Sequence, residues 1–162
     1  METAKIIQKM INFSSGNLHD INHFMKVWAF AKTIGELEKL NSKTQFILEI
    51  SAIVHDIACP LCREKYGNTN GKHQGIEGEA LVREFFKDTD FEQQQIDRIA
   101  YLVAHHHTFN EINGLDYQIL VEADYLVNAE ESNYSKQNIE NVKNRIIKTK
   151  SGIELLESMY KE

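Results

Sequence analysis

Histidine and aspartate side chains stand where the apolar stripes of several expected helices should continue. His23 begins an apolar line of helical spacing, and His55, His106 and Asp124 each extend or interrupt another such line. A buried carboxylate without a partner costs several kcal/mol, so Asp124 needs a cationic partner or a metal ion. Neutral imidazole and carboxylate are the usual ligands of divalent transition-metal ions. One such residue is typical of ordinary packing, but four on four helices, with Asp56 directly after His55, favour a metal site.

The elements that must position these side chains are all expected to be helices. Apolar residues recur at steps of three and four over about 23–37, 43–57, 75–86, 92–106 and 115–127, and more weakly over about 138–147 and 153–160. No segment combines β-branched residues with clean alternation, and a single proline leaves long helices uninterrupted. The prediction is an all-α, single-domain helical bundle. The Gly- and Asn-rich segment 58–72 is predicted to be one long loop, of a kind that often carries function.

Composition narrows the classes of partner. The chain has 162 residues, 42% of them hydrophobic, which is enough for one well-packed core. Its net charge of −6 argues against a basic nucleic-acid binder but leaves room for a small phosphorylated ligand. No apolar run reaches the 18 or so residues of a membrane span, and METAKIIQKM contains no secretory hydrophobic region, so a cytosolic protein is expected.

The order of the polar residues resembles a known family. His23, then His55-Asp56, then Asp124 match the H…HD…D pattern of the HD-domain metal-dependent phosphohydrolase superfamily. The segments HFMKVWAFA, AIVHDIA and ILVEADYLVN are similar to its ligand-bearing helices, and KYGNTNGKHQGIEG and HHHTFNEINGLDYQILVEAD resemble a bacterial branch of small, stand-alone members. The resemblance covers about 18–130. We therefore expect one HD-type domain over 1–162, with C-terminal helices in 136–162.

This resemblance implies that His23, His55, Asp56 and Asp124 bind one divalent ion, which could be Mn, Co, Ni, Zn, Mg or Fe. Adjacent residues on a helix point about 100° apart, so His55 and Asp56 can share an ion only beyond the helix end. The chemistry implied is hydrolysis of a phosphate ester or anhydride, with Asp56 both ligating the metal and orienting the attacking water.

Some members of the superfamily hold two metals with additional histidines. The run His105-His106-His107 resembles their histidine pair, which makes His105, His106 and Glu77 candidate ligands of a second ion. The earlier histidine of those members is matched here by Gln74, which argues against a second ion. Without one, His105 and His106 are expected to contact the substrate phosphate or to protonate the leaving oxygen, and His107 to face solvent.

Other residues carry weaker signals. The positive side chains expected to contact a substrate phosphate are Lys26, Arg63, Lys65 and Lys72, although a solvated surface explains the last three equally well. Cys59 and Cys62 form a CxxC without a βαβ context or a second cysteine pair, so we expect them to be incidental.

The expected function is a metal-dependent phosphohydrolase acting on a small phosphorylated metabolite, with a nucleotide favoured. The alternatives are a di-iron oxygenase of the same fold, a non-catalytic nucleotide-binding module, and a purely structural bundle. No nucleic-acid polymer or membrane partner is expected. The aromatic residues Phe24, Trp28 and Phe30 could lie in the core or at the seam of a homodimer.

Overall fold

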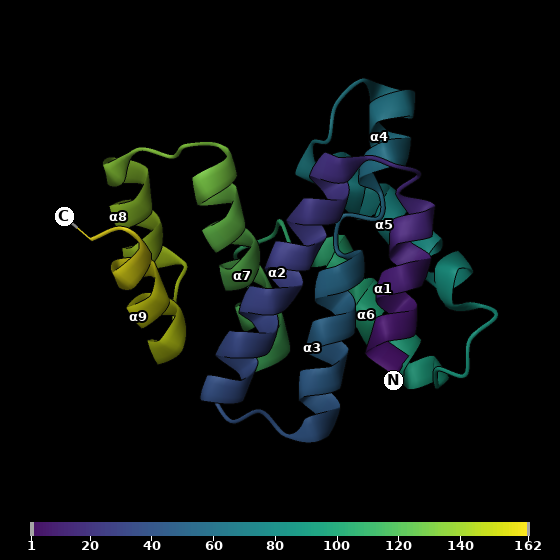
Figure 1. Cartoon of the computed structure of the whole chain (residues 1–162), viewed down its shortest axis with the longest axis horizontal. Coiled ribbons are helices and arrows are strands. Elements are labelled where there is room, and N and C mark those ends of the chain that lie inside the picture. Colours follow the sequence, from purple (N-terminus) through teal and green to yellow (C-terminus); the bar gives the residue numbers. More distant parts are fainter. Residues whose placement is uncertain (1, 162) are drawn as a thin grey trace.

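The computed structural model describes residues 2–161, and every regular element in that range is a helix (Figure 1). The helices are α1 (Glu2–Phe13), α2 (Leu18–Leu37), α3 (Ser42–Val54), α4 (Cys59–Tyr66), α5 (Gly71–Phe86), α6 (Gln93–His105), α7 (Leu115–Glu131), α8 (Lys136–Arg145) and α9 (Lys150–Met159). No strand occurs within 2–161, and the all-α prediction is confirmed.

Helix α3 lies at the centre of the bundle. It contacts α1, α2, α6 and α7, and every residue from Ile47 to Val54 is buried. Helix α7 packs along α2 as well as α3, so these three helices form the frame on which the polar residues sit. Helix α5 packs against α6, and the α8–α9 pair forms the end of the molecule where the chain terminates (Figure 1).

Local sequence sets the ends of the helices that carry the polar residues. The side chain of Asn17 accepts a hydrogen bond from the backbone of Asp20 and begins α2, and Asn41 does the same for α3 through Thr44. Helix α3 ends at Val54. His55 and Asp56 therefore follow its last turn, where two adjacent side chains can turn toward one point.

Two helices differ from the sequence prediction. The expected long loop over 58–72 contains α4, and only residues 67–70 separate α4 from α5. Pro60 lies in the first turn of α4, where a missing backbone N–H costs nothing, and Gly67 ends the helix with φ 70°. Helix α1 was not predicted, although Ile6 and Met10, four residues apart, are both buried.

The aromatic residues considered for a dimer seam, and a stretch apolar enough for a membrane span, lie mostly in the core. Phe24 is buried, and Trp28 and Phe30 are partly buried against the core cluster. By length and composition the stretch Ser42–Tyr66 could cross a membrane, but 72% of its apolar window is buried inside the protein. Burial of this extent is typical of a helix in a protein core.

Candidate metal centre

Three helices bring the H…HD…D residues to one point. His23 comes from α2, His55 and Asp56 from the end of α3, and Asp124 from α7. The Nε2 atom of His23 lies 3.1 Å from His55 Nε2, 3.2 Å from Asp124 Oδ1 and 3.3 Å from Asp56 Oδ2. The Nε2 atom of His55 lies 3.5 Å from Asp56 Oδ2 and 3.4 Å from Asp124 Oδ1. Donors about 2.1 Å from one tetrahedral ion are about 3.4 Å apart, so these distances fit a divalent metal. The atoms of His23, His55 and Asp124 form one group that could hold an ion, and those of His55, Asp56 and His106 form another.

Hydrogen bonds behind the cluster orient its histidines. The Nδ1 atom of His55 lies 2.7 Å from the carbonyl oxygen of Ala52, to which it can only donate, so the proton is on Nδ1 and Nε2 keeps its lone pair. His23 Nδ1 lies 2.7 Å from Glu131 Oε2, an arrangement that likewise directs Nε2 toward the cluster. Asn128 donates to Asp124 Oδ1 at 2.9 Å. These partners hold the ring and carboxylate geometry that a metal ligand requires.

The histidines and carboxylates of the cluster shift one another's pKa values. Burial alone would lower the pKa of His23, but the hydrogen bond to Asp124 and the charge of Asp56 raise it to about 9. Burial would raise the pKa values of Asp56 and Asp124, but the neighbouring histidines hold both below their usual range. Both carboxylates are therefore ionised at neutral pH. Binding of a cation would displace the proton from His23.

Two further histidines face the same cluster. His106 is buried, and its Nε2 atom lies 3.4 Å from Asp56 Oδ1. Neither His106 Nε2 nor His107 Nε2 has a hydrogen-bond partner, although both atoms are buried. Burial and the neighbouring His106 lower the pKa of His107 to about 4, so its ring is neutral. His106, His107 and Asp124 form a second set of converging donors that could hold a cation. Unpartnered buried nitrogen atoms at this position fit a metal ion or a ligand.

The structure does not bring His105 or Glu77 to this cluster. The ring of His105 stacks on Tyr101 with centroids 4.1 Å apart, and its Nδ1 donates to the Tyr101 carbonyl oxygen. Glu77 accepts hydrogen bonds from Lys65 at 2.5 Å and from Tyr66 at 2.6 Å. His107, which was expected to face solvent, lines the cavity beside the cluster, because α6 ends at His105 and helical periodicity no longer sets the direction of the residues that follow.

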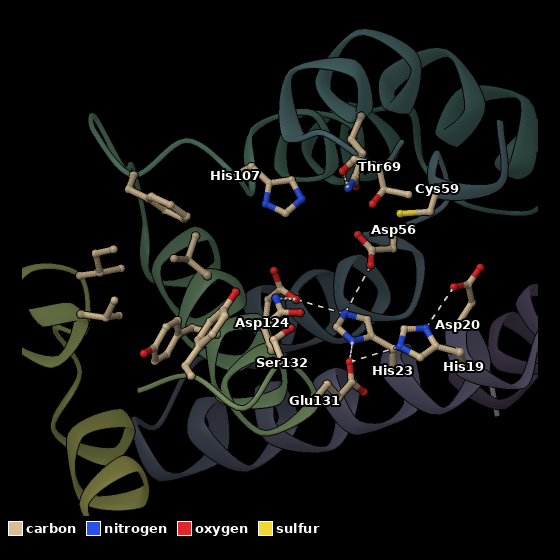
Figure 2. Close-up of a pocket in the computed structure, with 18 of the residues that line it drawn as sticks. His19, Asp20, His23, Asp56, Cys59, Thr69, His107, Asp124, Glu131 and Ser132 are labelled. Atoms are coloured by element: carbon tan, nitrogen blue, oxygen red, sulfur yellow. Dashed lines mark hydrogen bonds and ion pairs between the residues drawn. The ribbon is translucent and has the colours of Figure 1, made fainter. Parts of the chain in front are cut away.

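A cavity of about 490 Å³ opens beside the cluster. In Figure 2 the side chains of His23, Asp56, Asp124 and His107 surround it from different elements. Gln74 also lines it and is 4% exposed. The amide nitrogen of Gln74 donates to the Thr69 carbonyl oxygen, while its Oε1 atom has no partner.

Of the four expected phosphate-binding cations, only Arg63 lines this cavity, where it is paired with Asp20. Lys26 is paired with Glu130 and Glu131, and Lys65 with Glu77. Neither lysine lines the cavity. Lys72 lines an adjoining hollow that shares His107 and Phe109 with the cavity. Three of the four cations thus pair with acidic side chains, and sequence spacing does not reveal those pairings.

The two cysteines are buried and free. Cys59 lines the cavity, and Cys62 lies one turn further along α4. Burial raises the pKa values of both thiols, so neither is a reactive thiolate.

Comparison with known families decides the broader identity of this fold. The sequence profile of the HD domain matches residues 20–140, which include His23, His55, Asp56 and Asp124. The chain belongs to the HD domain family. Proteins with an HD domain are generally metal-dependent phosphohydrolases, and the buried His/Asp groups of this HD domain could hold the metal. No curated protein and no solved structure matches the chain.

Sequence reasoning missed one carboxylate of this HD domain that its spacing could have revealed. Glu131 follows Asp124 by seven residues, and Asn128 follows it by four, so all three share one face of α7. The extended helix, which runs past the predicted end at 127, is what places Glu131 behind His23.

Proposed function

We propose that this HD-domain protein is a metal-dependent hydrolase of phosphate esters or anhydrides. Its substrate would be a small phosphorylated metabolite, with a nucleotide as the first candidate. The observation that carries the proposal is the convergence of two imidazole nitrogens and two carboxylates from three helices, in which each imidazole nitrogen lies within 3.5 Å of the other and of both carboxylates. Such donors beside a cavity fit a divalent ion that is reachable by a small molecule.

His23, His55, Asp56 and Asp124 would hold that ion. When bound, it supplies Lewis acidity and lowers the pKa of a coordinated water. Asp56 directs Oδ2 toward His23 and Oδ1 toward His106, so one carboxylate can both ligate the ion and accept a hydrogen bond from the attacking water. Glu131 and Ala52 hold the rings of His23 and His55 in place.

The remaining groups at the cavity would handle the substrate. His106 and His107 have unpartnered nitrogen atoms that can donate to a phosphoryl oxygen or protonate the leaving oxygen. Arg63 can offset negative charge on the phosphate. We therefore move the substrate-contacting role from His105 to His107 and retain it for His106.

A second ion would change the class of reaction. The set His106, His107 and Asp124 is the observation that favours one. Two bound irons with oxygen uptake would support the di-iron oxygenase. The complete donor set argues against a non-catalytic nucleotide-binding module, because binding alone does not require every metal ligand.

The test is the metal content per chain of untagged protein purified without chelator, beside Asp56→Ala and the matched control Asp97→Ala. Asp97 is exposed and pairs with Arg83 outside the cavity. We expect about one divalent ion in the wild-type protein and in Asp97→Ala, and none in Asp56→Ala. Phosphate release from a panel of nucleotides should be lost together with the metal.

Other outcomes would redirect or overturn the proposal. Two irons per chain, with oxygen consumption, would favour the oxygenase. Tight nucleotide binding without product across several metals would favour the binding module. Absence of metal from wild-type protein even after soaking with Mn, Zn and Fe would overturn the metal-dependent function altogether.

A further inference from the structure

The cavity extends well beyond the metal centre. Figure 2 shows His19, Asp20 and Cys59 at one side, while the ribbon of the C-terminal helices borders the opposite side, with Asp124 between them. The residues that line this second part come from α7, from α8 and its C-terminal end, and from the segments before these two helices. The apolar and aromatic ones are Phe109, Val121, Tyr125, Tyr134, Val142 and Ile146. One continuous space thus joins a charged region to an aromatic one.

Two tyrosines give the aromatic region a defined surface. The rings of Tyr125 and Tyr134 lie 5.9 Å apart and are tilted by 33°. The hydroxyl of Tyr125 donates to Asn138 Oδ1 at 2.8 Å, which fixes the Tyr125 ring against α8. Tyr134 is 38% exposed. Rigid rings of this kind bind flat, apolar groups at low entropic cost because few rotatable bonds must be ordered.

The charges of the cavity limit how many phosphates it can accept. Among its lining residues within 2–161, Arg63 is the one lysine or arginine, and it already pairs with Asp20. Four lining carboxylates, those of Asp20, Asp56, Asp124 and Glu131, face it. With histidines neutral, these carboxylates outnumber the positive charges even when one divalent ion is bound. A second phosphate group would find no free cation in the cavity to offset its charge.

We propose that the cavity selects monophosphate esters whose leaving group carries a planar aromatic ring, which lies against Tyr125 and Tyr134 while the phosphate reaches the metal centre. This specificity rests on the proposed phosphohydrolase function. In the reaction, the oxygen of water forms a bond to phosphorus, the ester P–O bond breaks, and one proton passes to the leaving oxygen. The products are inorganic phosphate and the aromatic alcohol, with no oxidation or reduction.

The test compares three substrates that share the same phosphate ester bond. These are AMP, ribose 5-phosphate, which lacks the ring, and adenosine 2′,5′-bisphosphate, which adds one phosphate. Stacking of a base on an aromatic side chain typically changes affinity by about tenfold or more. We therefore expect kcat/KM for AMP to exceed that for ribose 5-phosphate by at least about tenfold. The bisphosphate should also be a poorer substrate than AMP.

Two variants assign these preferences to the aromatic region. Tyr134→Ala should lower the ratio of kcat/KM for AMP to that for ribose 5-phosphate, whereas Phe13→Ala should leave it unchanged. Phe13 is a matched control because it is 40% exposed and lies at the end of α1, outside the cavity. Val142→Lys places an ammonium group in the aromatic region, and we expect it to raise the relative use of the bisphosphate.

Calorimetric binding of the same three compounds to the metal-loaded protein separates failure of this proposal from failure of the proposed function. Preferential, Tyr134-dependent binding of AMP without turnover would overturn the hydrolase and retain the cavity specificity. Equal binding and equal turnover of AMP and ribose 5-phosphate would overturn the specificity and retain the hydrolase. A ratio that is unchanged in Tyr134→Ala would also overturn the specificity.

Discussion

Asp124 and Glu122 lie two residues apart on α7, and both are buried, yet they meet opposite surroundings. Asp124 faces the imidazoles of His23 and His55 and borders a cavity. Glu122 faces the start of α9, where it accepts hydrogen bonds from the backbone of Lys148 and Thr149, at 2.7 and 2.9 Å, and from the Thr149 hydroxyl.

The difference teaches how to distinguish a functional from a structural carboxylate in this fold. Glu122 is bound by fixed donors of the chain itself, which include Gln118 Nε2 at 2.8 Å, and it does not line the cavity beside the metal centre. Asp124 is held by titratable groups that could equally bind an ion. Burial of a carboxylate is common to both, so the chemistry and accessibility of its partners decide the interpretation.

The largest effect is expected from Asp124→Asn. Loss of an outer partner of a metal-bound histidine typically costs 10- to 100-fold in affinity, so loss of a direct ligand should lower metal affinity and turnover by more than about 100-fold. Metal titration and phosphate release measure this. Unfolding of the metal-free protein in urea is measured beside these, because the variant also loses the carboxylate that raises the pKa of His23. Retention of metal would contradict the role assigned to Asp124.

Glu122→Gln is expected to lower stability and to leave metal binding unchanged. An amide cannot accept from all the donors that surround the carboxylate: if its oxygen faces the backbone N–H groups of residues 148 and 149, its NH₂ group replaces the oxygen that accepts from the Thr149 hydroxyl. The free energy of unfolding should fall by about 2 kcal/mol, as measured in urea. The folded variant should still bind metal at the wild-type ratio. Loss of metal with unchanged stability would invalidate the comparison.

Glu131→Gln tests whether Glu131, the partner of His23, is a functional carboxylate like Asp124 or a structural one like Glu122. Because the carboxylate orients the ring and raises the basicity of its nitrogen, metal affinity should fall about 10- to 100-fold. Glu130→Gln is the matched control, since Glu130 pairs with the same Lys26 but does not line the cavity. Equal metal affinity in the two variants would assign Glu131 to the structural side.

The smallest effect concerns Glu38, a second carboxylate that holds the start of α9. It accepts from the backbone N–H of Ser151 at 2.8 Å, and this bond lowers its pKa. A carboxylate with a lowered pKa stabilises the fold above its ordinary value of 4.5 and loses that contribution as the pH falls. Glu38→Gln should therefore cost up to about 1 kcal/mol at pH 7 and progressively less below pH 4.5 in urea unfolding. A difference that is constant with pH would refute this role.

The frame of the site could be predicted from the sequence because it depends on helical periodicity. His23 and Asp124 lie within long helices, where spacing of three and four residues defines the inner face. That His55 and Asp56 lie at a helix end could also be predicted, since adjacent residues can direct their side chains to one ion only there. The H…HD…D pattern supplied the order of the same four residues.

What could not be predicted depends on helix ends and on distant partners. His105 packs on Tyr101, whereas His107 lines the cavity, because α6 ends between them. Lys65 and Glu77 were candidate functional residues, but they neutralise each other across α4 and α5, a pairing that no local pattern contains. Helix α4 was missed because the segment 58–72 was interpreted as a loop from its Gly and Asn residues, although all of these follow Tyr66, the last residue of the helix.

The bond between Glu122 and the start of α9 has a consequence for how the protein opens. If α9 detached alone, the Glu122 side chain would lose the donors of residues 148 and 149, so we expect fraying of the C-terminal helix to be coupled to disruption of the bundle. The backbone amides of α9 should then exchange with solvent at rates close to those of α7. Such rates would place the residues after the HD match, 141–161, in the same cooperative folding unit as the metal centre.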